Sequence, residues 1–239
     1  MSRVIGVMGG LGPEGTVHYY RKLTERFASV PLERGRPGIL IDHVWIDRFS
    51  ALLRAEAEPE IQTLLLGSLE RLHHGGADLA LIAAVTPHRF LPRLRAASPL
   101  PIVDIVSATR DDVLAAGHRA VGLLGTRVTV TQRFFRSGLE EAGVEVAIPG
   151  EDDIEYLNNL IFGPLASGQK TPAMREELSA VVRRMAASAK LDALVVACTD
   201  LMDLLEPSLP LLDPIDSHVR VAAERLLEPG AAKPRQRSD

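Results

Sequence analysis

The sequence predicts an α/β protein of two similar lobes, each built on a parallel sheet. Two observations support this prediction. Short, nearly continuous apolar runs alternate with longer amphipathic stretches, and the two halves of the chain repeat one another. Apolar runs without polar alternation are typical of parallel strands that helices cover on both faces.

The first half opens with an apolar strand, Val4–Met8, that ends in the glycine-rich turn Gly9–Pro13. A helix is expected from Glu14 to Ala28, because an acidic residue lies near its start and basic residues lie toward its end. The other elements expected here are the strands Ile39–Trp45, Ala80–Ala84 and Pro101–Val103, and the helix Glu58–Leu72, whose leucines recur at helical spacing.

The second half follows the same scheme. Its expected strands are Ala120–Leu124, Val144–Ile148 and Ala193–Ala197, and its expected helices cover 129–142, 152–166 and 172–189. A last helix, Ser217–Leu227, follows the turn Asp213–Asp216. We therefore expect an N-terminal lobe of residues 1–106 with the last helix, 215–227, a C-terminal lobe of 107–214, and a disordered tail of 228–239.

Composition excludes several classes of protein. The chain has 239 residues, of which 46% are hydrophobic and 24% charged, so it is globular rather than fibrous or disordered. A net charge of -4 argues against a nucleic-acid partner. No apolar run approaches the about 20 residues that span a bilayer, so no membrane association is expected. A single cysteine cannot form an internal disulfide and indicates a cytoplasmic protein.

Two pairs of segments form an internal repeat. Ile5–Gly10 resembles Val121–Thr126 at an offset of 116, and Asp78–Ala84 resembles Asp192–Cys198 at an offset of 114. A pseudo-twofold between the lobes would bring the carboxyl ends of their strands face to face, where ligands of open α/β sheets bind. We therefore expect an active site in the cleft between the lobes, with Ala84 and Cys198 as counterparts.

Two of the strand ends allow a functional and a structural interpretation. Gly9–Pro13 permits a close backbone approach and aims helix N–H groups at an anion, or is simply a tight turn. It lacks the G-x-G-x-x-G pattern of dinucleotide-binding turns. Cys198 precedes a probable helix start, whose N–H groups favour a thiolate while Asp200 opposes it; alternatively it is a buried, inert cysteine.

Three further residues also remain open. Thr86 and Thr199 either cap their helices or donate to a carboxylate or enolate oxygen. The guanidinium group of Arg48 either forms a bidentate hydrogen bond with a ligand carboxylate or forms an ion pair with an acidic residue at the surface. The seven histidines show no metal-ligand spacing, so neither a metal nor another cofactor is expected.

Taken together, these segments resemble the aspartate/glutamate racemase family of cofactor-independent enzymes with two cysteines. The turn Gly9–Pro13 with Thr16, Tyr19 and Tyr20 matches the N-terminal signature of the family, and Asp47-Arg48 matches its Asp-Arg pair. Its two catalytic motifs appear as Ala84-Val85-Thr86-Pro87-His88 and Ala197-Cys198-Thr199-Asp200, and its Gly-Thr-x-x-Thr turn appears as Gly125–Thr129. The late Asp of the family is matched by Asp213 or Asp216.

The resemblance implies that one thiol removes the α-proton of an amino acid while a second delivers a proton to the opposite face. Here Ala84 replaces the first cysteine, so the second face is left to water, Thr86 or His88. The resemblance implies Cys198 and Thr86 as catalytic residues. It further implies that substrate is bound by Gly10, Arg48, Val85, Thr86, Thr126, Thr129, Thr199 and Asp200.

Three functions fit this pattern. The first is a racemase or epimerase with Cys198 as its single thiol acid/base. The second is a decarboxylase of a substituted malonate, like the arylmalonate decarboxylases, in which Ala84 leaves room for the departing CO2. The third is an inactive protein that binds an amino acid or dicarboxylate. The resemblance also implies a homodimer.

Overall fold

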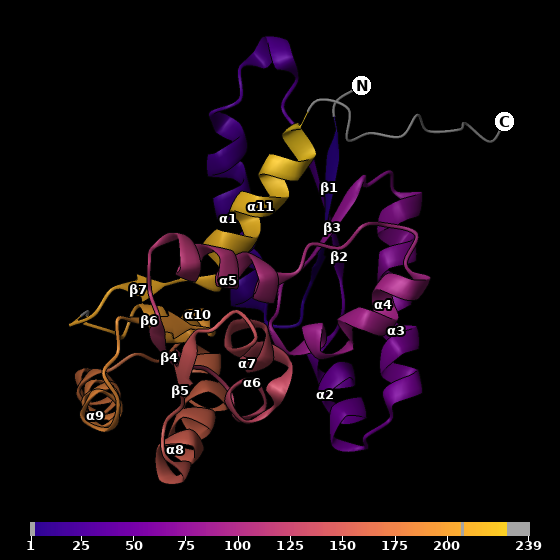
Figure 1. The fold of residues 1–239 in the computed structure, drawn as a ribbon. Coiled ribbons are helices and arrows are strands. Elements are labelled where there is room, and N and C mark those ends of the chain that lie inside the picture. The colour runs from indigo at the N-terminus through magenta and orange to yellow at the C-terminus, as the bar shows by residue number, and fades with distance from the viewer. Residues whose placement is uncertain (1–2, 207, 229–239) are drawn as a thin grey trace, which may run out of the picture. The chain divides into compact units, whose positions relative to one another are not determined.

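The structure is a computed structural model that describes residues 3–206 and 208–228. The chain divides into two compact units (Figure 1). Unit 1 comprises Met1–Asp104 with His218–Asp239, and unit 2 comprises Ile105–Ser217. The tail predicted at 228–239 lies outside the described residues, apart from residue 228. The α/β class with parallel sheets is confirmed.

Unit 1 contains a three-stranded parallel sheet in the order β2-β1-β3. Its strands are β1 (Val4–Gly9), β2 (Gly38–His43) and β3 (Leu79–Ile82). Its helices are α1 (Pro13–Ala28), α2 (Ile46–Arg54), α3 (Glu58–His74), α4 (Leu91–Ala97) and most of α11 (Pro214–Leu227), with the short 3-10 helices η1 (Leu32–Arg34) and η2 (Thr86–Phe90).

Helices cover both faces of this sheet. Figure 1 shows α1 and α11 on one side of β1 and β3, and α3 and α4 on the other. Met8 and Ile82 point into the α3 side, where Leu65 and Leu69 of α3 and Leu94 of α4 pack against them. This burial explains why β1 and β3 are almost continuously apolar in sequence.

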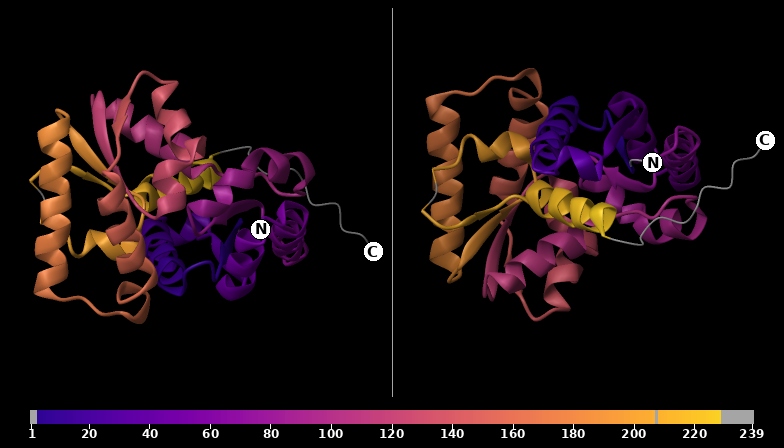
Figure 2. Two further views of the ribbon diagram at one scale, coloured as in Figure 1. Left: turned by 90° about the horizontal axis from the view of Figure 1, so that it is seen from below. Right: turned by 90° about the horizontal axis from the view of Figure 1, so that it is seen from above.

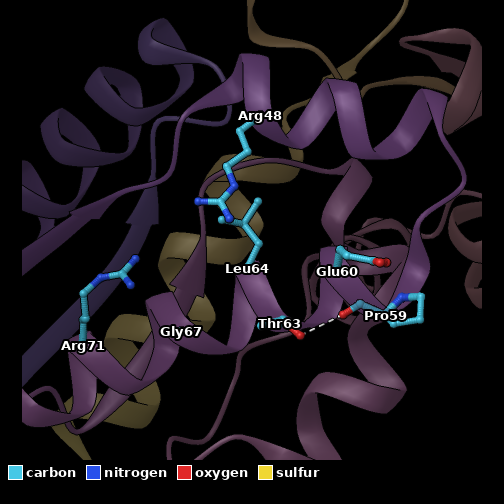
Figure 3. Close-up of a pocket in the computed structure, with 7 residues that line it drawn as sticks. All are labelled: Arg48, Pro59, Glu60, Thr63, Leu64, Gly67 and Arg71. Atoms are coloured by element: carbon cyan, nitrogen blue, oxygen red, sulfur yellow. Dashed lines mark hydrogen bonds between the residues drawn. The ribbon is translucent and has the colours of Figure 1, made fainter.

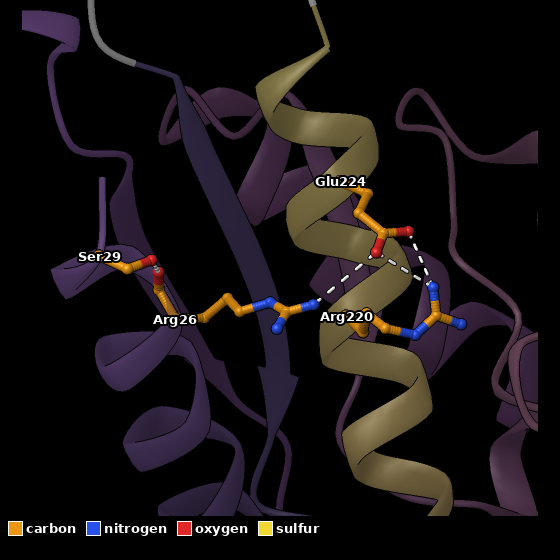
Figure 4. A network of polar contacts seen from close by, with 4 residues as sticks. All are labelled: Arg26, Ser29, Arg220 and Glu224. Carbon is orange, nitrogen blue, oxygen red and sulfur yellow. Dashed lines mark hydrogen bonds and ion pairs between the residues drawn. The ribbon is translucent and has the colours of Figure 1, made fainter. Parts of the chain in front are cut away.

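Helix α11 returns to pack beside α1. Figure 4 shows Glu224 between two arginines: Arg220 of the same helix donates to it at 2.9 Å, and Arg26 of α1 lies 3.7 Å away. All three side chains are about a third or more exposed, so the ion pairs contribute little. The apolar face of α11, with Val219 and Ala222 fully or nearly buried, holds the helix in place.

Unit 2 contains a four-stranded parallel sheet in the order β5-β4-β6-β7. Its strands are β4 (Ala120–Leu124), β5 (Glu145–Ala147), β6 (Ala193–Val196) and β7 (Leu211–Leu212). Its helices are α5 (Ile105–Ala115), α6 (Arg127–Thr131), α7 (Arg133–Glu140), α8 (Glu151–Phe162), α9 (Pro172–Ser188) and α10 (Thr199–Met202), with the 3-10 helix η3 (Leu165–Ser167). Figure 2 shows α9 beside β6 and β7, and Val181 and Met185 of α9 share one core with Leu194 of β6.

The predicted repeat is visible in the hydrogen bonds. Asp78 accepts from the N–H of Val4 at 2.8 Å, and Asp192 accepts from the N–H of Ala120 at 3.0 Å. At the other end of the strands, the Ala83 N–H donates to Met8 and the Ala197 N–H donates to Leu124. Equivalent residues in these four hydrogen bonds are separated by the same offsets of 116 and 114, so the repeat is structural. It includes an aspartate that fixes the start of the central strand pair in each unit.

The structure differs from the prediction in three places. The expected strand Pro101–Val103 is a single bridge between Ala80 and Ile102. The expected helix 129–142 breaks at the extended residue Gln132, after four β-branched residues, 128–131, that are poor helix formers. Helices α2, α4 and α5 and strand β7 were not predicted, because each is short or closely follows another element. None of the helices in the described residues has the length and apolar character needed to cross a bilayer.

A buried histidine pair lies in the core of unit 1. The hydroxyl of Tyr19 lies 2.7 Å from Nδ1 of His218, and Nε2 of His218 lies 3.1 Å from the carbonyl oxygen of Val103. A carbonyl only accepts, so Nε2 carries the proton and Tyr19 donates to Nδ1. The ring of His88 lies 5.4 Å from that of His218. Burial lowers the pKa of His88, and burial together with neighbouring His88 holds the pKa of His218 well below its usual range.

These lowered pKa values predict that unit 1 loses stability in acid. In the unfolded chain a histidine takes up a proton near pH 6.5, whereas in the folded protein the pair stays neutral. The contribution of the neutral pair to the free energy of unfolding is therefore complete above pH 6.5 and is lost below it. Each histidine reduces the free energy of unfolding by up to about 1.4 kcal/mol per pH unit in this range. Urea unfolding at pH 7 and pH 5 should show a smaller acid loss in His218→Gln than in the wild type. The exposed control His74→Gln should behave like the wild type, and an equal acid loss in all three proteins would contradict this account.

Candidate active site

The turn after β1 is shaped by glycine. Gly10 has a φ of 83°, and a Cβ there would lie 2.3 Å from the carbonyl oxygen of Val44, so no other residue fits. The Gly10 N–H donates to Oγ1 of Thr16 at 2.9 Å. The turn therefore brings its backbone close to the end of β2 and anchors it to the first turns of α1.

The turn after β3 contains Ala84, Val85 and Thr86, which are all half-buried. Nδ1 of His88 donates to the carbonyl oxygen of Ala84 at 2.9 Å, which fixes the first peptide of the turn. Nε2 of His88 is buried without a hydrogen-bond partner among the described residues, and the side chain is only 4% exposed. His88 thus faces the core and supports the turn, rather than offering a proton at its surface.

The turn after β4 carries the two predicted threonines of unit 2. Thr126 caps α6: its Oγ1 accepts from the N–H of Thr129 at 3.4 Å and lies 3.1 Å from the Thr129 hydroxyl. Thr129 is buried, whereas Thr126 is half-buried. The structure therefore gives Thr126 a capping role with the Thr129 hydroxyl beside it, and the contact of either threonine with a substrate stays a prediction.

Cys198 follows β6 and is the N-cap residue of α10. The residue is half-buried, and it packs against the core that α8 and α9 form with the sheet. Thr199 and Asp200, also half-buried, form the first turn of α10. Because β4 and β6 pair with Leu124 opposite Val196, the Thr126 turn and the Cys198 turn lie at neighbouring strand ends.

The electrostatic environment of Cys198 favours the neutral thiol. Burial and, second, the charge of Asp200 raise the pKa of Cys198 to about 12, although the N–H groups of Asp200 and Leu201 lower it. The N–H groups and Asp200 thus act in the expected directions, but burial outweighs the N–H groups of a helix of only four residues, so the thiol is neutral in the free protein.

Arg48 lies on α2, apart from the strand-end turns. Its side chain reaches along α3 and lines an open pocket of about 480 Å³ together with Pro59, Glu60, Thr63, Leu64, Gly67 and Arg71 (Figure 3). Arg71 is already engaged, since its Nε and Nη2 atoms fork onto Asp42 at 2.7 and 2.8 Å. Burial raises the pKa of Asp42, but the hydrogen bonds and the charge of Arg71 outweigh it and hold that pKa below its usual value.

Each unit thus gathers its own set of predicted residues. Unit 1 brings Gly10 close to the Ala84–Thr86 turn, because the Ala83 N–H donates to the Met8 carbonyl at 2.9 Å. Unit 2 brings the Thr126 turn close to Cys198. The His88–His218 pair behind the Ala84–Thr86 turn was not predicted. Within the described residues, no group of three or more His, Cys, Asp or Glu side chains could hold a metal ion.

Several known proteins are similar to this chain over most of its length. The model of the Asp/Glu/Hydantoin racemase family matches residues 8–222. The broad specificity amino-acid racemase RacX of Bacillus subtilis is 23% identical over 218 residues, which are 88% of this chain and 92% of that protein. A candidate Asp/Glu racemase from Yersinia pestis has a TM-score of 0.85 at 27% identity, over 95% of this chain and all of that one. An aspartate racemase homologue from Pyrococcus horikoshii has a TM-score of 0.81 at 29% identity, with the same coverage.

The raised pKa of Cys198 predicts slow, steeply pH-dependent alkylation of the free protein. Because this is the only cysteine in the chain, the iodoacetamide rate reports it alone. The rate should rise about tenfold per pH unit from pH 7 to pH 10 without a plateau, since only the thiolate reacts. Asp200→Asn should speed alkylation at pH 8, because it removes a like charge, whereas Asp203→Asn should not. A plateau below pH 9 would contradict the raised pKa.

Proposed function

Because the chain belongs to the Asp/Glu/Hydantoin racemase family, an isomerase family, we propose that it is a cofactor-independent amino-acid racemase of the aspartate/glutamate type. In this proposal Cys198 is the single thiol acid/base. The Bacillus subtilis relative is described as having broad specificity, so the substrate screen has to extend beyond the acidic amino acids. A free thiol requires a reducing environment, so the proposal includes a cytoplasmic location.

The position of Cys198 is the observation that carries the proposal. The only thiol of the chain stands at the carboxyl end of a buried parallel strand, half-buried and followed by a hydroxyl residue, Thr199. Ligands of open α/β sheets bind at such strand ends. An inert structural cysteine would need none of these neighbours.

The raised pKa defines what this thiol does first. With a pKa of about 12, forming the thiolate at pH 7 costs about 7 kcal/mol, since one pKa unit corresponds to about 1.36 kcal/mol. The free protein therefore holds Cys198 as a proton donor. Acting as a base requires a nearby positive charge that offsets Asp200, and the ammonium group of a bound amino acid supplies one.

The remaining roles belong to the same proposal. Removal of an α-proton places negative charge on the substrate carboxylate, and hydrogen-bond donors stabilise that charge. We assign this task to the hydroxyls of Thr86 and Thr199 and to the backbone N–H of Val85. Gly10, whose own N–H donates to Thr16, would instead give the substrate a close approach to the backbone. Thr126, Thr129 and Asp200 would complete the contacts with substrate. Arg48 would hold a side-chain carboxylate, for which its guanidinium fork is suited.

Ala84 favours a second candidate, a single-thiol decarboxylase of a substituted malonate. At position 84 the chain carries a methyl group and no acid, so protons can be delivered by a thiol only at position 198. One thiol is enough for a decarboxylase, because the reaction replaces a departing CO2 by a single proton. Release of CO2 from a disubstituted malonate, without α-proton exchange in any amino acid, would favour this candidate over the racemase.

Cys198→Ser should abolish α-proton exchange. Proton NMR in D2O over the L- and D-amino acids identifies the substrate with the wild type, and the variant should lose at least about 10²-fold in rate, the lower bound for general acid–base catalysis. Serine is close in volume to cysteine, so the melting temperature should stay nearly unchanged. Full activity in a folded Cys198→Ser protein would remove the assignment.

Ala84→Cys should raise the rate of inversion. The repeat makes residue 84 the counterpart of Cys198, and two thiols would serve both faces of the α-carbon. Chiral chromatography measures inversion, and Ala83→Ser, in the preceding buried residue, controls for changes in packing. In a decarboxylase the same substitution should make the product racemic. If the folded variant binds substrate normally but changes neither inversion nor product chirality, residue 84 does not reach the reacting carbon.

A further inference from the structure

His88 contacts two successive peptide groups of the turn after β3. Its ring Nδ1 lies 2.9 Å from the carbonyl oxygen of Ala84, and its backbone N–H donates to the carbonyl oxygen of Val85 at 3.0 Å. The His88 side chain is buried in unit 1. Both carbonyl groups of this part of the turn therefore face inward, toward one buried residue.

The direction of these carbonyl groups determines the direction of the neighbouring N–H groups. Among the described residues there is no cis peptide bond, and in a trans peptide the C=O and N–H bonds point in opposite directions. The N–H groups of Val85 and Thr86 consequently point away from His88. Neither N–H has a hydrogen-bond acceptor within residues 3–206 and 208–228, and both residues are only half-buried.

The contact with Ala84 fixes the tautomer of the His88 ring. A carbonyl oxygen only accepts, so Nδ1 carries the proton and Nε2 is an acceptor. Nε2 is buried and has no partner among the described residues, which is an unfavourable state for a polar atom. Burial lowers the pKa of His88, so the ring stays neutral at pH 7. The ring thus satisfies the carbonyl group of the turn and leaves its own second nitrogen unsatisfied.

The ring of His88 is also held from behind. His218 meets it edge-on, with 5.4 Å between the ring centroids and 71° between the ring planes. His218 is bound in turn to Tyr19 and to the carbonyl oxygen of Val103, whose N–H donates to Ala80 of β3 at 3.0 Å. The ring is therefore tied to the same strand that leads into the turn.

We propose that His88 is a positioning residue for α-proton exchange, because it holds the Ala84–Val85 peptide with the Val85 N–H aimed at the substrate carboxylate. This inference rests on the proposed function, in which that N–H is one of the donors. Hydrogen bonds in a chain polarise one another, so donation by Nδ1 to the carbonyl group strengthens the N–H of the same peptide as a donor. A donor that is already aimed at the developing charge needs no reorganisation during the reaction. His88 acts through the peptide and does not touch the substrate.

Two variants with the same functional group separate this role from a purely structural one. His88→Asn places an amide N–H at the position of Nδ1, whereas His88→Gln places it at the position of Nε2. For α-proton exchange in D2O, kcat should stay within about threefold of the wild type in His88→Asn and fall about 10²-fold in His88→Gln, the lower limit for loss of one such donor. KM should be unchanged in both variants, since the donor acts on charge that develops in the transition state.

Melting temperatures supply the control for this pair of variants. Asparagine is shorter than glutamine and leaves a larger void in the core, so His88→Asn should be the less stable protein. The expected order of activity is therefore the reverse of the expected order of stability. Activity that follows the melting temperature across the two variants, or a wild-type kcat in His88→Gln, would overturn the inference.

The tautomer of His88 tests the geometry without any measurement of activity. Nitrogen-15 NMR on the full wild-type chain, labelled at histidine, should find the ring proton of His88 on Nδ1 and that of His218 on Nε2 at pH 7. The signal that disappears in His88→Gln identifies the ring. A proton on Nε2 of His88 would overturn the inference by itself. A wild type that exchanges no α-proton would remove the proposed function and this inference together, whereas a wild type that exchanges while His88→Gln keeps its kcat would remove this inference alone.

Discussion

Two pairs of parallel strands determine where the candidate residues of this protein lie, with the exception of Arg48 on α2. β1 pairs with β3 in unit 1, and β4 pairs with β6 in unit 2, with equivalent register. Asp78 and Asp192 hold the amino-terminal ends of these pairs through backbone N–H groups. Because both ends of each pair are fixed, the turns that follow the strands begin at fixed points, and the reactive residues belong to those turns.

The strand ends impose a compromise on Cys198. A residue that ends a buried strand packs against the core, and this burial raises the pKa of its thiol to about 12. The same position leaves the residue partly exposed. A poorly ionised thiol that gains its charge only beside a cationic ligand avoids the side reactions of a free thiolate, since only the thiolate is nucleophilic. In unit 1, the turn after β3 is fixed by a side chain, because the His88 ring donates a hydrogen bond to the carbonyl oxygen of Ala84.

Much of the fold could be predicted from the sequence, because the strongest signals were those of buried strands. β4 was predicted with its observed bounds, and the offset repeat is confirmed down to the aspartates at the strand starts. Short elements escaped prediction: α2 follows β2 after only two residues, and β7 has two residues, too few for periodicity to show. The ionisation of Cys198 stayed open at the level of sequence, because burial depends on tertiary packing that a local motif does not encode. His218 could not be linked to His88 from sequence, since 130 residues separate them.

The central claim is that one thiol, Cys198, exchanges the α-proton on one face of an amino acid. The most direct test incubates each enantiomer of the substrate with the wild type in D2O and measures both deuterium at the α-carbon and configuration at early times. A single-thiol enzyme predicts that one enantiomer gains deuterium faster than it inverts, with its configuration retained. If instead both enantiomers acquire deuterium only as they invert, and at similar rates, a second acid/base of equal strength acts on the other face and the account is wrong.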